Sequence, residues 1–189
     1  MSEILQDSAP LRRGDTLELE IEKAAFEGRC VSHVNGLVVF VDGAVPGDRV
    51  RATVFRKKKQ FAEARVEEIL APSPFRVEPP CRHFGVCGGC KWQHMAYDQQ
   101  LRWKREHVLD AFTRIGGLEG VLVQETIPAD EPFWYRNKME YSFGEMRWLL
   151  PDELGTADRD AELFALGLHV PKRYDRILHI DECLSLIHI

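Results

Sequence analysis

Three of the chain's five cysteines stand within ten residues, and this cluster constrains the fold more than any other feature. Five residues separate Cys81 from Cys87, and a Gly-Gly pair separates Cys87 from Cys90. Thiolates are soft ligands that bind iron–sulfur clusters or zinc. The glycines allow a tight turn and expose amide N–H groups that can bond to cluster sulfur. A four-coordinate site needs one more ligand, for which Cys183 is the natural candidate.

The spacing alone leaves the identity of the metal open. Zinc is the alternative to an iron–sulfur cluster, with His83 or His94 as a further ligand. Buried free cysteines that pack as small hydrophobic groups are a third interpretation, which three neighbouring thiols beside two glycines disfavour. Cys30 differs from the others because it lies in an apolar run, and we expect it in the core.

The region 14–71 predicts a small β-barrel. Leu17, Leu19 and Ile21 alternate with glutamates, which is the period of a half-buried strand. Asn35-Gly36 between two apolar runs predicts a tight hairpin. Five short strands in this region favour a closed, five-stranded barrel of the oligonucleotide-binding type. The five runs are 17–21, 30–34, 37–41, 49–55 and 61–69.

A basic run lies between the last two of these strands. Phe55 and Phe61 flank Arg56, Lys57, Lys58 and Lys59. Lysines can neutralise phosphates and exposed rings can stack on bases, so the run suits single-stranded nucleic acid. A solvated turn, with both rings in the core, is the alternative. The net charge of −5 argues against a protein that coats nucleic acid, so a local patch has to provide any binding.

The rest of the chain predicts an α+β region. Residues 72–80 are proline-rich and read as a linker, and 1–13 read as a flexible lead. Beyond the linker, 81–189 would hold the cysteine site and further elements. We expect a helix over 98–115 that ends at Gly116-Gly117, strands over 138–143 and 163–170, and a loop over 151–161.

Two further groups of side chains could contact nucleic acid. Trp134-Tyr135-Arg136-Asn137-Lys138 combines aromatic and guanidinium planes that can stack on splayed-out bases. A structural loop that leads into a strand is the alternative. Arg102, Lys104 and Arg105 near the start of the predicted helix could face RNA, although a plain solvated face is favoured. No apolar run is long enough to span a bilayer, and the N-terminus lacks a secretory signal, so we expect a cytoplasmic protein.

The order of these features resembles a known family, the iron–sulfur RNA (uracil-5-)-methyltransferases, of which the bacterial 23S rRNA uridine-5-methyltransferases are typical. The resemblance lies in a small barrel followed by C-x5-C-G-G-C-x2-Q-H-x2-Y-x2-Q-L-x2-K over 81–104. The segments 135–138, 166–168 and 180–183 are also similar to the family. In this family the barrel is called a TRAM domain. The resemblance covers about 14–183, and the cysteine motif is its specific part.

This resemblance implies a function and a set of site residues. Cys81, Cys87, Cys90 and Cys183 would hold a four-iron, four-sulfur (4Fe-4S) cluster. The parent protein would use S-adenosylmethionine to methylate C5 of a uridine in RNA, above all 23S ribosomal RNA. It would act as a monomer that binds RNA and no membrane. The expected RNA-binding residues are Arg56, Lys57, Lys58, Lys59, Arg136 and Lys138.

The sequence departs from the family at its C-terminal end. In the family, the Rossmann-like methyltransferase domain, the nucleophilic cysteine and the catalytic base follow the fourth cluster cysteine, whereas this chain stops six residues after it. We therefore expect the catalytic half to be missing and the chain alone to be inactive. Residues 184–189 resemble a translated sequencing adapter. The alternative function is a non-catalytic RNA-binding module with a structural zinc or iron–sulfur site, and an electron-transfer protein is a weaker one.

Overall fold

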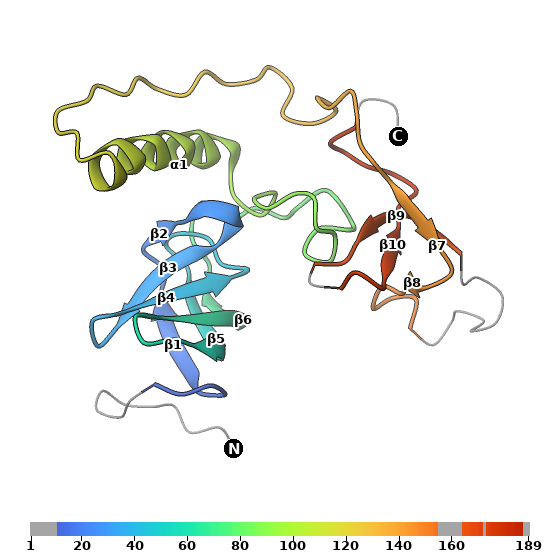
Figure 1. Cartoon of the computed structure of the whole chain (residues 1–189), viewed down its shortest axis with the longest axis horizontal. Coiled ribbons are helices and arrows are strands. Elements are labelled where there is room, and N and C mark those ends of the chain that lie inside the picture. The colour runs from blue at the N-terminus through green and yellow to red at the C-terminus, as the bar shows by residue number, and fades with distance from the viewer. Residues whose placement is uncertain (1–10, 155–163, 172, 187–189) are drawn as a thin grey trace. The chain divides into compact units, whose positions relative to one another are not determined.

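The computed structural model describes residues 11–154, 164–171 and 173–186. The chain forms two compact units (Figure 1). The first comprises 1–78 and 94–128, and the second comprises 79–93 and 129–189. The division into a barrel, a linker and a cysteine region at 71, 80 and 81 stays a prediction. No described helix is both long and apolar enough to cross a lipid bilayer.

A six-stranded mixed sheet forms most of the first unit. Its strand order is β1-β5-β6-β4-β3-β2, with β4 and β6 parallel and every other pair antiparallel. The strands are β1 Thr16–Glu20, β2 Lys23–Ala24, β3 Cys30–Val34, β4 Leu37–Asp42, β5 Arg49–Lys57 and β6 Phe61–Ala71. The five strands expected from the sequence are therefore present, and the short β2 was not anticipated.

The strand pairing shows a mixed sheet and does not by itself show the closed barrel that we expected. Among the described strands, β1 and β2 are the two edges, and they are nearly continuous in sequence. The chain bends between them, where the Ile21 N–H bonds to the Asp48 carbonyl and the Glu22 N–H bonds to the Val31 carbonyl. The predicted hairpin is confirmed, because Asn35 and Gly36 both have positive φ between β3 and β4.

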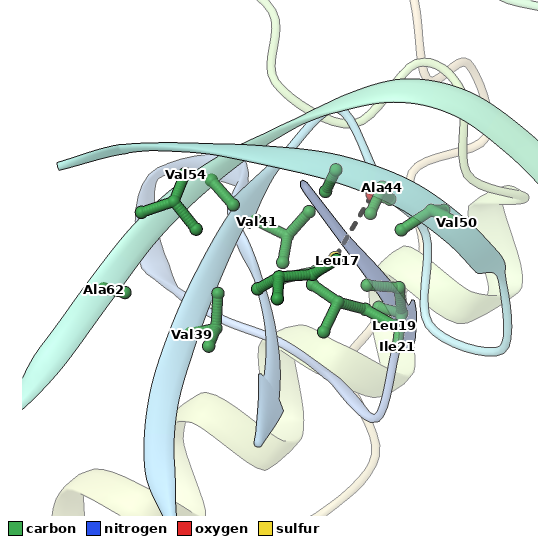
Figure 2. Close-up of a cluster of buried hydrophobic side chains, with 12 residues drawn as sticks. Leu17, Leu19, Ile21, Val39, Val41, Ala44, Val50, Val54 and Ala62 are labelled. Atoms are coloured by element: carbon green, nitrogen blue, oxygen red, sulfur yellow. Dashed lines mark hydrogen bonds between the residues drawn. The ribbon is translucent and has the colours of Figure 1, made fainter. Parts of the chain in front are cut away.

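The alternating side chains of this sheet gather into one core (Figure 2). Leu17 and Leu19 are buried whereas Glu18 and Glu20 are exposed, as the period of two predicts. Cys30 is fully buried in this cluster, and its Sγ donates to the Ala44 carbonyl at 3.1 Å. Burial raises the pKa of Cys30 to about 12, so this thiol is a core residue as expected.

The proline-rich segment is fixed to the sheet rather than free. Asp48 is buried and accepts hydrogen bonds from the Val45 and Ser73 amides at 2.7 and 2.8 Å. Arg76 binds the same carboxylate through Nε and a terminal nitrogen, the latter at 2.6 Å. The Val77 N–H continues this attachment by bonding to the His94 carbonyl. Composition predicted a linker here, but the Asp48 contacts order its first half.

The expected helix is present. Helix α1 spans Tyr97–Asp110 and continues as a π-helical turn over Ala111–Ile115. It ends at Gly116-Gly117, where a Cβ on Gly116 would lie 2.7 Å from the Phe112 carbonyl oxygen. His107 anchors the helix within its unit by stacking on Phe26 and bonding to the Ala24 carbonyl at 3.0 Å.

The second unit contains a four-stranded sheet of order β7-β9-β10-β8. Its strands are β7 Ser142–Gly144, β8 Arg147–Trp148, β9 Ala165–His169 and β10 Ile177–His179. The expected strand over 163–170 corresponds to β9. The strand expected over 138–143 begins only at Ser142, because the residues before it are irregular.

Four expectations fall partly on residues outside the described ranges. They concern most of the flexible lead over 1–13, the part of the loop over 151–161 that follows residue 154, the first residue of the strand expected over 163–170 and the last three residues of the segment 184–189.

Candidate functional site

The structure brings the side chains of four cysteines to one pocket in the second unit. Cys81, Cys87 and Cys90 come from the loop that opens this unit, and Cys183 follows strand β10. The pocket has an empty volume of about 390 Å³. Two segments that are far apart in sequence therefore supply a set of soft ligands to one space.

Short backbone turns shape the cysteine loop. The Phe84 N–H bonds to the Cys81 carbonyl at 3.0 Å, and the Cys87 N–H bonds to the His83 carbonyl at 2.8 Å. The Gly89 N–H points at the Cys87 Sγ at 3.3 Å. These contacts place an amide of the Gly-Gly pair beside the Cys87 thiol, and the bonding of such amides to cluster sulfur stays a prediction.

The two glycines differ in how much room surrounds them. A Cβ on Gly88 would lie 3.3 Å from the His169 carbonyl oxygen, which is tighter than an ordinary contact, so a larger residue there would require the loop or strand β9 to shift slightly. A Cβ on Gly89 would lie 3.4 Å from the Cys87 Sγ, which is an ordinary van der Waals distance.

The pKa values of Cys81, Cys87 and Cys183 shift in different directions. Burial raises the pKa of Cys81 and Cys87, and the charges of the other cysteines raise it further. For Cys183, burial also opposes ionisation, but hydrogen bonds from Ser185 outweigh it and lower the pKa. Burial, with the nearby Cys183, raises the pKa of Tyr141 to about 12. A cation bound among the thiols would favour their ionised forms.

The described side chains are not arranged as the ligands of a single metal ion. Within the described ranges, no three His, Cys, Asp or Glu side chains are grouped closely enough to hold a single ion. Tetrahedral zinc with Zn–S bonds of about 2.3 Å requires sulfurs about 3.8 Å apart. His83 is buried and lines the cysteine pocket. His94 belongs to the first unit, where its Nε2 bonds to the Ala44 carbonyl at 3.0 Å.

The basic run on the first unit is partly neutralised. Arg56 pairs with the buried Glu63 at 3.2 Å, so its charge is engaged within the sheet. The side chain of Lys57 bonds to the carbonyl of Lys58. Lys58 and Lys59 are exposed in the turn between β5 and β6. Lys58 and Lys59 are therefore better placed than Arg56 and Lys57 to contact a phosphate.

The two flanking rings are neither core residues nor fully exposed. Phe61 packs edge-on against Phe40 with ring centroids 5.7 Å apart. Arg65 lies over the ring of Phe55 at 5.9 Å. Both phenylalanines are half-buried on the sheet surface and lie outside the core cluster.

The basic residues of α1 have local structural partners. The Arg105 Nε donates to the Val123 carbonyl at 2.8 Å. The guanidinium of Arg102 lies 5.7 Å from the Trp103 ring, and the Lys104 ammonium lies 5.9 Å from the Tyr97 ring. These contacts agree with the plain surface face that the sequence favoured.

Sequence reasoning missed two neighbours of the cysteine site. The Ser185 Oγ lies 3.3 Å from the Cys183 Sγ. Tyr141, like Cys87 and Cys183, is partly buried and packs against the second unit's core cluster. The spacing of Ser185 from Cys183 could have suggested a local hydrogen bond. Nothing in the local pattern around Tyr141 points to the cysteines, which are distant in sequence.

The chain has relatives among known proteins. The family model described as TRAM domain matches residues 10–66. The chain is 42% identical over 168 residues to an uncharacterized RNA methyltransferase of Porphyromonas gingivalis, a match that covers 87% of this chain and 36% of the relative. It is 41% identical over 181 residues to an uncharacterized RNA methyltransferase of Chlorobaculum tepidum, covering 94% of this chain and 38% of the relative.

Among solved structures, the chain is similar to a Pyrococcus abyssi tRNA (uracil-54, C5)-methyltransferase in complex with S-adenosyl-L-homocysteine. The sequence identity is 24% and the TM-score is 0.48, and the match covers 89% of this chain and 32% of that one. The chain thus spans little over a third of the length of the curated relatives that it matches.

Proposed function

We propose that this chain, which carries a TRAM domain and is homologous to RNA methyltransferases, is the RNA-binding part of an S-adenosylmethionine-dependent RNA (uracil-5-)-methyltransferase. The observation that carries the proposal is the identity of 41% to an RNA methyltransferase over 94% of the chain. The TRAM match over 10–66 supports binding of RNA by the first unit. The proposed substrate is a uridine of RNA, and of 23S ribosomal RNA in particular, with methyl transfer to its C5 atom.

The proposal includes a four-iron, four-sulfur cluster held by Cys81, Cys87, Cys90 and Cys183. Its support is that all four thiols line one pocket of the second unit and that thiolates are the usual ligands of iron–sulfur clusters. The Gly89 amide would stabilise the Cys87 thiolate by its hydrogen bond.

The cluster would cross-link the cysteine loop to the segment after β10. The chain's own side chains would bind RNA. In the proposal, methyl transfer uses groups of a longer protein, since this chain matches only 36% and 38% of the length of the two RNA methyltransferases described above. The expected RNA contacts are Lys58 and Lys59 on the first unit and Arg136 on the second, with Arg56, Lys57 and Lys138 as further candidates.

A methyl-transfer assay tests the proposed activity. The full gene product would be incubated with methyl-labelled S-adenosylmethionine and a 23S rRNA transcript, with the 189-residue chain as a matched control. We expect 5-methyluridine from the full product and none from this chain. Label at another atom, or turnover by the short chain, would contradict the assignment of reaction or of catalytic residues.

A charge substitution tests the proposed RNA surface. Replacing Lys58 and Lys59 with glutamine should weaken binding of single-stranded RNA and reduce its salt dependence. Each lost phosphate contact lowers the slope of log K against log salt by about 0.7 for single strands. Lys23→Gln is the control, because Lys23 is an exposed lysine of the same unit that lies outside the basic run. An equal slope change in the control and the double variant would argue against a specific role of the two lysines.

A further inference from the structure

The segment 134–136 in the second unit has an unusual backbone. Trp134 has a φ of +51°, and it is one of three non-glycine residues with positive φ in the described ranges. Another of them, Asn35, belongs to an Asn-Gly turn, where this conformation is common. For a bulky residue such as tryptophan, a positive φ is strained and persists only where the surroundings enforce it.

The enforcement comes from main-chain hydrogen bonds on both sides of the strained residue. The Trp134 N–H donates to the Leu184 carbonyl at 2.7 Å, and the Arg136 N–H donates to the Ser185 carbonyl at 2.9 Å. A parallel bridge between Arg136 and Leu186 extends the pairing. Because these bonds use main-chain atoms, they do not depend on the side chains that follow Cys183.

The strained turn presents aromatic side chains outward. Trp134 is 48% exposed and Tyr135 is 64% exposed. Phe133 contacts the Trp134 ring edge-on, with centroids 6.1 Å apart and planes at 63°. Large exposed rings side by side in sequence are uncommon without a partner, since their burial would otherwise be favourable.

The charges of the segment indicate which partner it suits. Arg136 is exposed and has no ion pair among the described residues, whereas the Lys138 ammonium is 3.1 Å from the Glu140 carboxylate. A guanidinium next to two exposed rings matches a phosphate next to unstacked bases. A double helix keeps its bases stacked and could not use the rings in this way.

We propose that Trp134 and Tyr135 form a stacking platform for unpaired bases of single-stranded RNA, with Arg136 bound to the adjoining phosphate. The inference rests on the proposed function, because it specifies how the RNA of that function is held. It adds two aromatic residues to the basic side chains considered above. It also assigns the segment 134–136 to binding nucleic acid, and not to packing against another protein region.

Substitution of the tryptophan separates stacking from charge. The probe is a fluorescein-labelled oligouridine of about 12 nucleotides, a length typical of single-strand sites, with Kd from anisotropy on the 189-residue chain. Trp134→Ala should weaken binding roughly 5- to 100-fold and leave the salt slope unchanged, since stacking releases no counterions. Arg136→Gln should reduce the slope by about 0.7. Tyr174→Ala is the matched control, because Tyr174 is 92% exposed outside the segment.

Trp134→Phe guards against a folding artefact. Phenylalanine retains an aromatic face, so affinity should stay within about threefold of wild type, while RNA-dependent quenching of tryptophan fluorescence should largely disappear. Wild-type affinity in Trp134→Ala and Tyr135→Ala would overturn the platform and assign the segment to protein packing. Equal affinity for duplex RNA would overturn it as well. Absence of RNA binding by the wild type would instead overturn the proposed function on which the inference depends.

Discussion

Under the proposed cluster ligation, replacing Cys87 with serine is expected to abolish iron binding by this chain. A serine hydroxyl is a poor ligand for iron compared with a thiolate, and a cubane cluster with three remaining ligands is easily lost. Cys87 is the thiol nearest the Gly89 amide, so the variant also loses that hydrogen bond. After anaerobic purification, the wild type should contain about four irons per chain and absorb visible light, and Cys87→Ser should be nearly colourless and iron-free.

Cys30→Ala is the matched control for this experiment. Cys30 is a core residue of the first unit, so its replacement should leave the iron content unchanged. Loss of iron in both variants would mean that general unfolding, and not ligand loss, explains the result. One zinc per chain without colour in the wild type would contradict the cluster and favour a non-catalytic RNA-binding module with a structural zinc.

The strand pattern of the first unit was predictable because it depends on local periodicity. The alternation around Leu17 and the Asn35-Gly36 turn each encode one element and its register without reference to the rest of the chain. Closure was not predictable in this way. Whether β1 and β2 close the sheet into a barrel depends on the bend of the chain near Ile21. Main-chain hydrogen bonds to Asp48 and Val31, which are distant in sequence, determine this bend.

In the candidate site, too, local features were predictable from the sequence and long-range contacts were not. Clustered cysteines are recognisable in sequence, and Cys183 could be named as their partner by its type alone. The strain at Trp134 could not be recognised, because bonds to residues fifty positions later impose it. The proline-rich segment shows the same limit, since prolines predict a linker whereas Asp48 and Arg76, which pair across the sequence, fix the segment in place.

Asp48→Ala is expected to destabilise the first unit by about 3–5 kcal/mol, because it removes one partner of a buried ion pair. The Asp48 carboxylate is fully buried. Its loss would leave the amides of Val45 and Ser73 without their acceptor and would leave Arg76 with the Gly43 carbonyl but no carboxylate partner. Urea unfolding at neutral pH, followed by circular dichroism, measures the change. Glu68→Ala is the control, since Glu68 pairs with Arg51 at the exposed surface and should cost under about 1 kcal/mol.

The same carboxylate should make stability depend on pH in the acid range. Burial alone would raise the pKa of Asp48, but hydrogen bonds from Arg76, Ser73 and Val45 outweigh it and lower the pKa. As the pH falls, the unfolded chain therefore takes up this proton before the folded protein does. The stabilising contribution is complete above the unfolded pKa of about 3.9 and is lost as the pH falls through the lower folded value. Asp48→Asn should remove this part of the acid sensitivity, and an unchanged acid profile in that variant would show that other carboxylates, such as Glu63, control it.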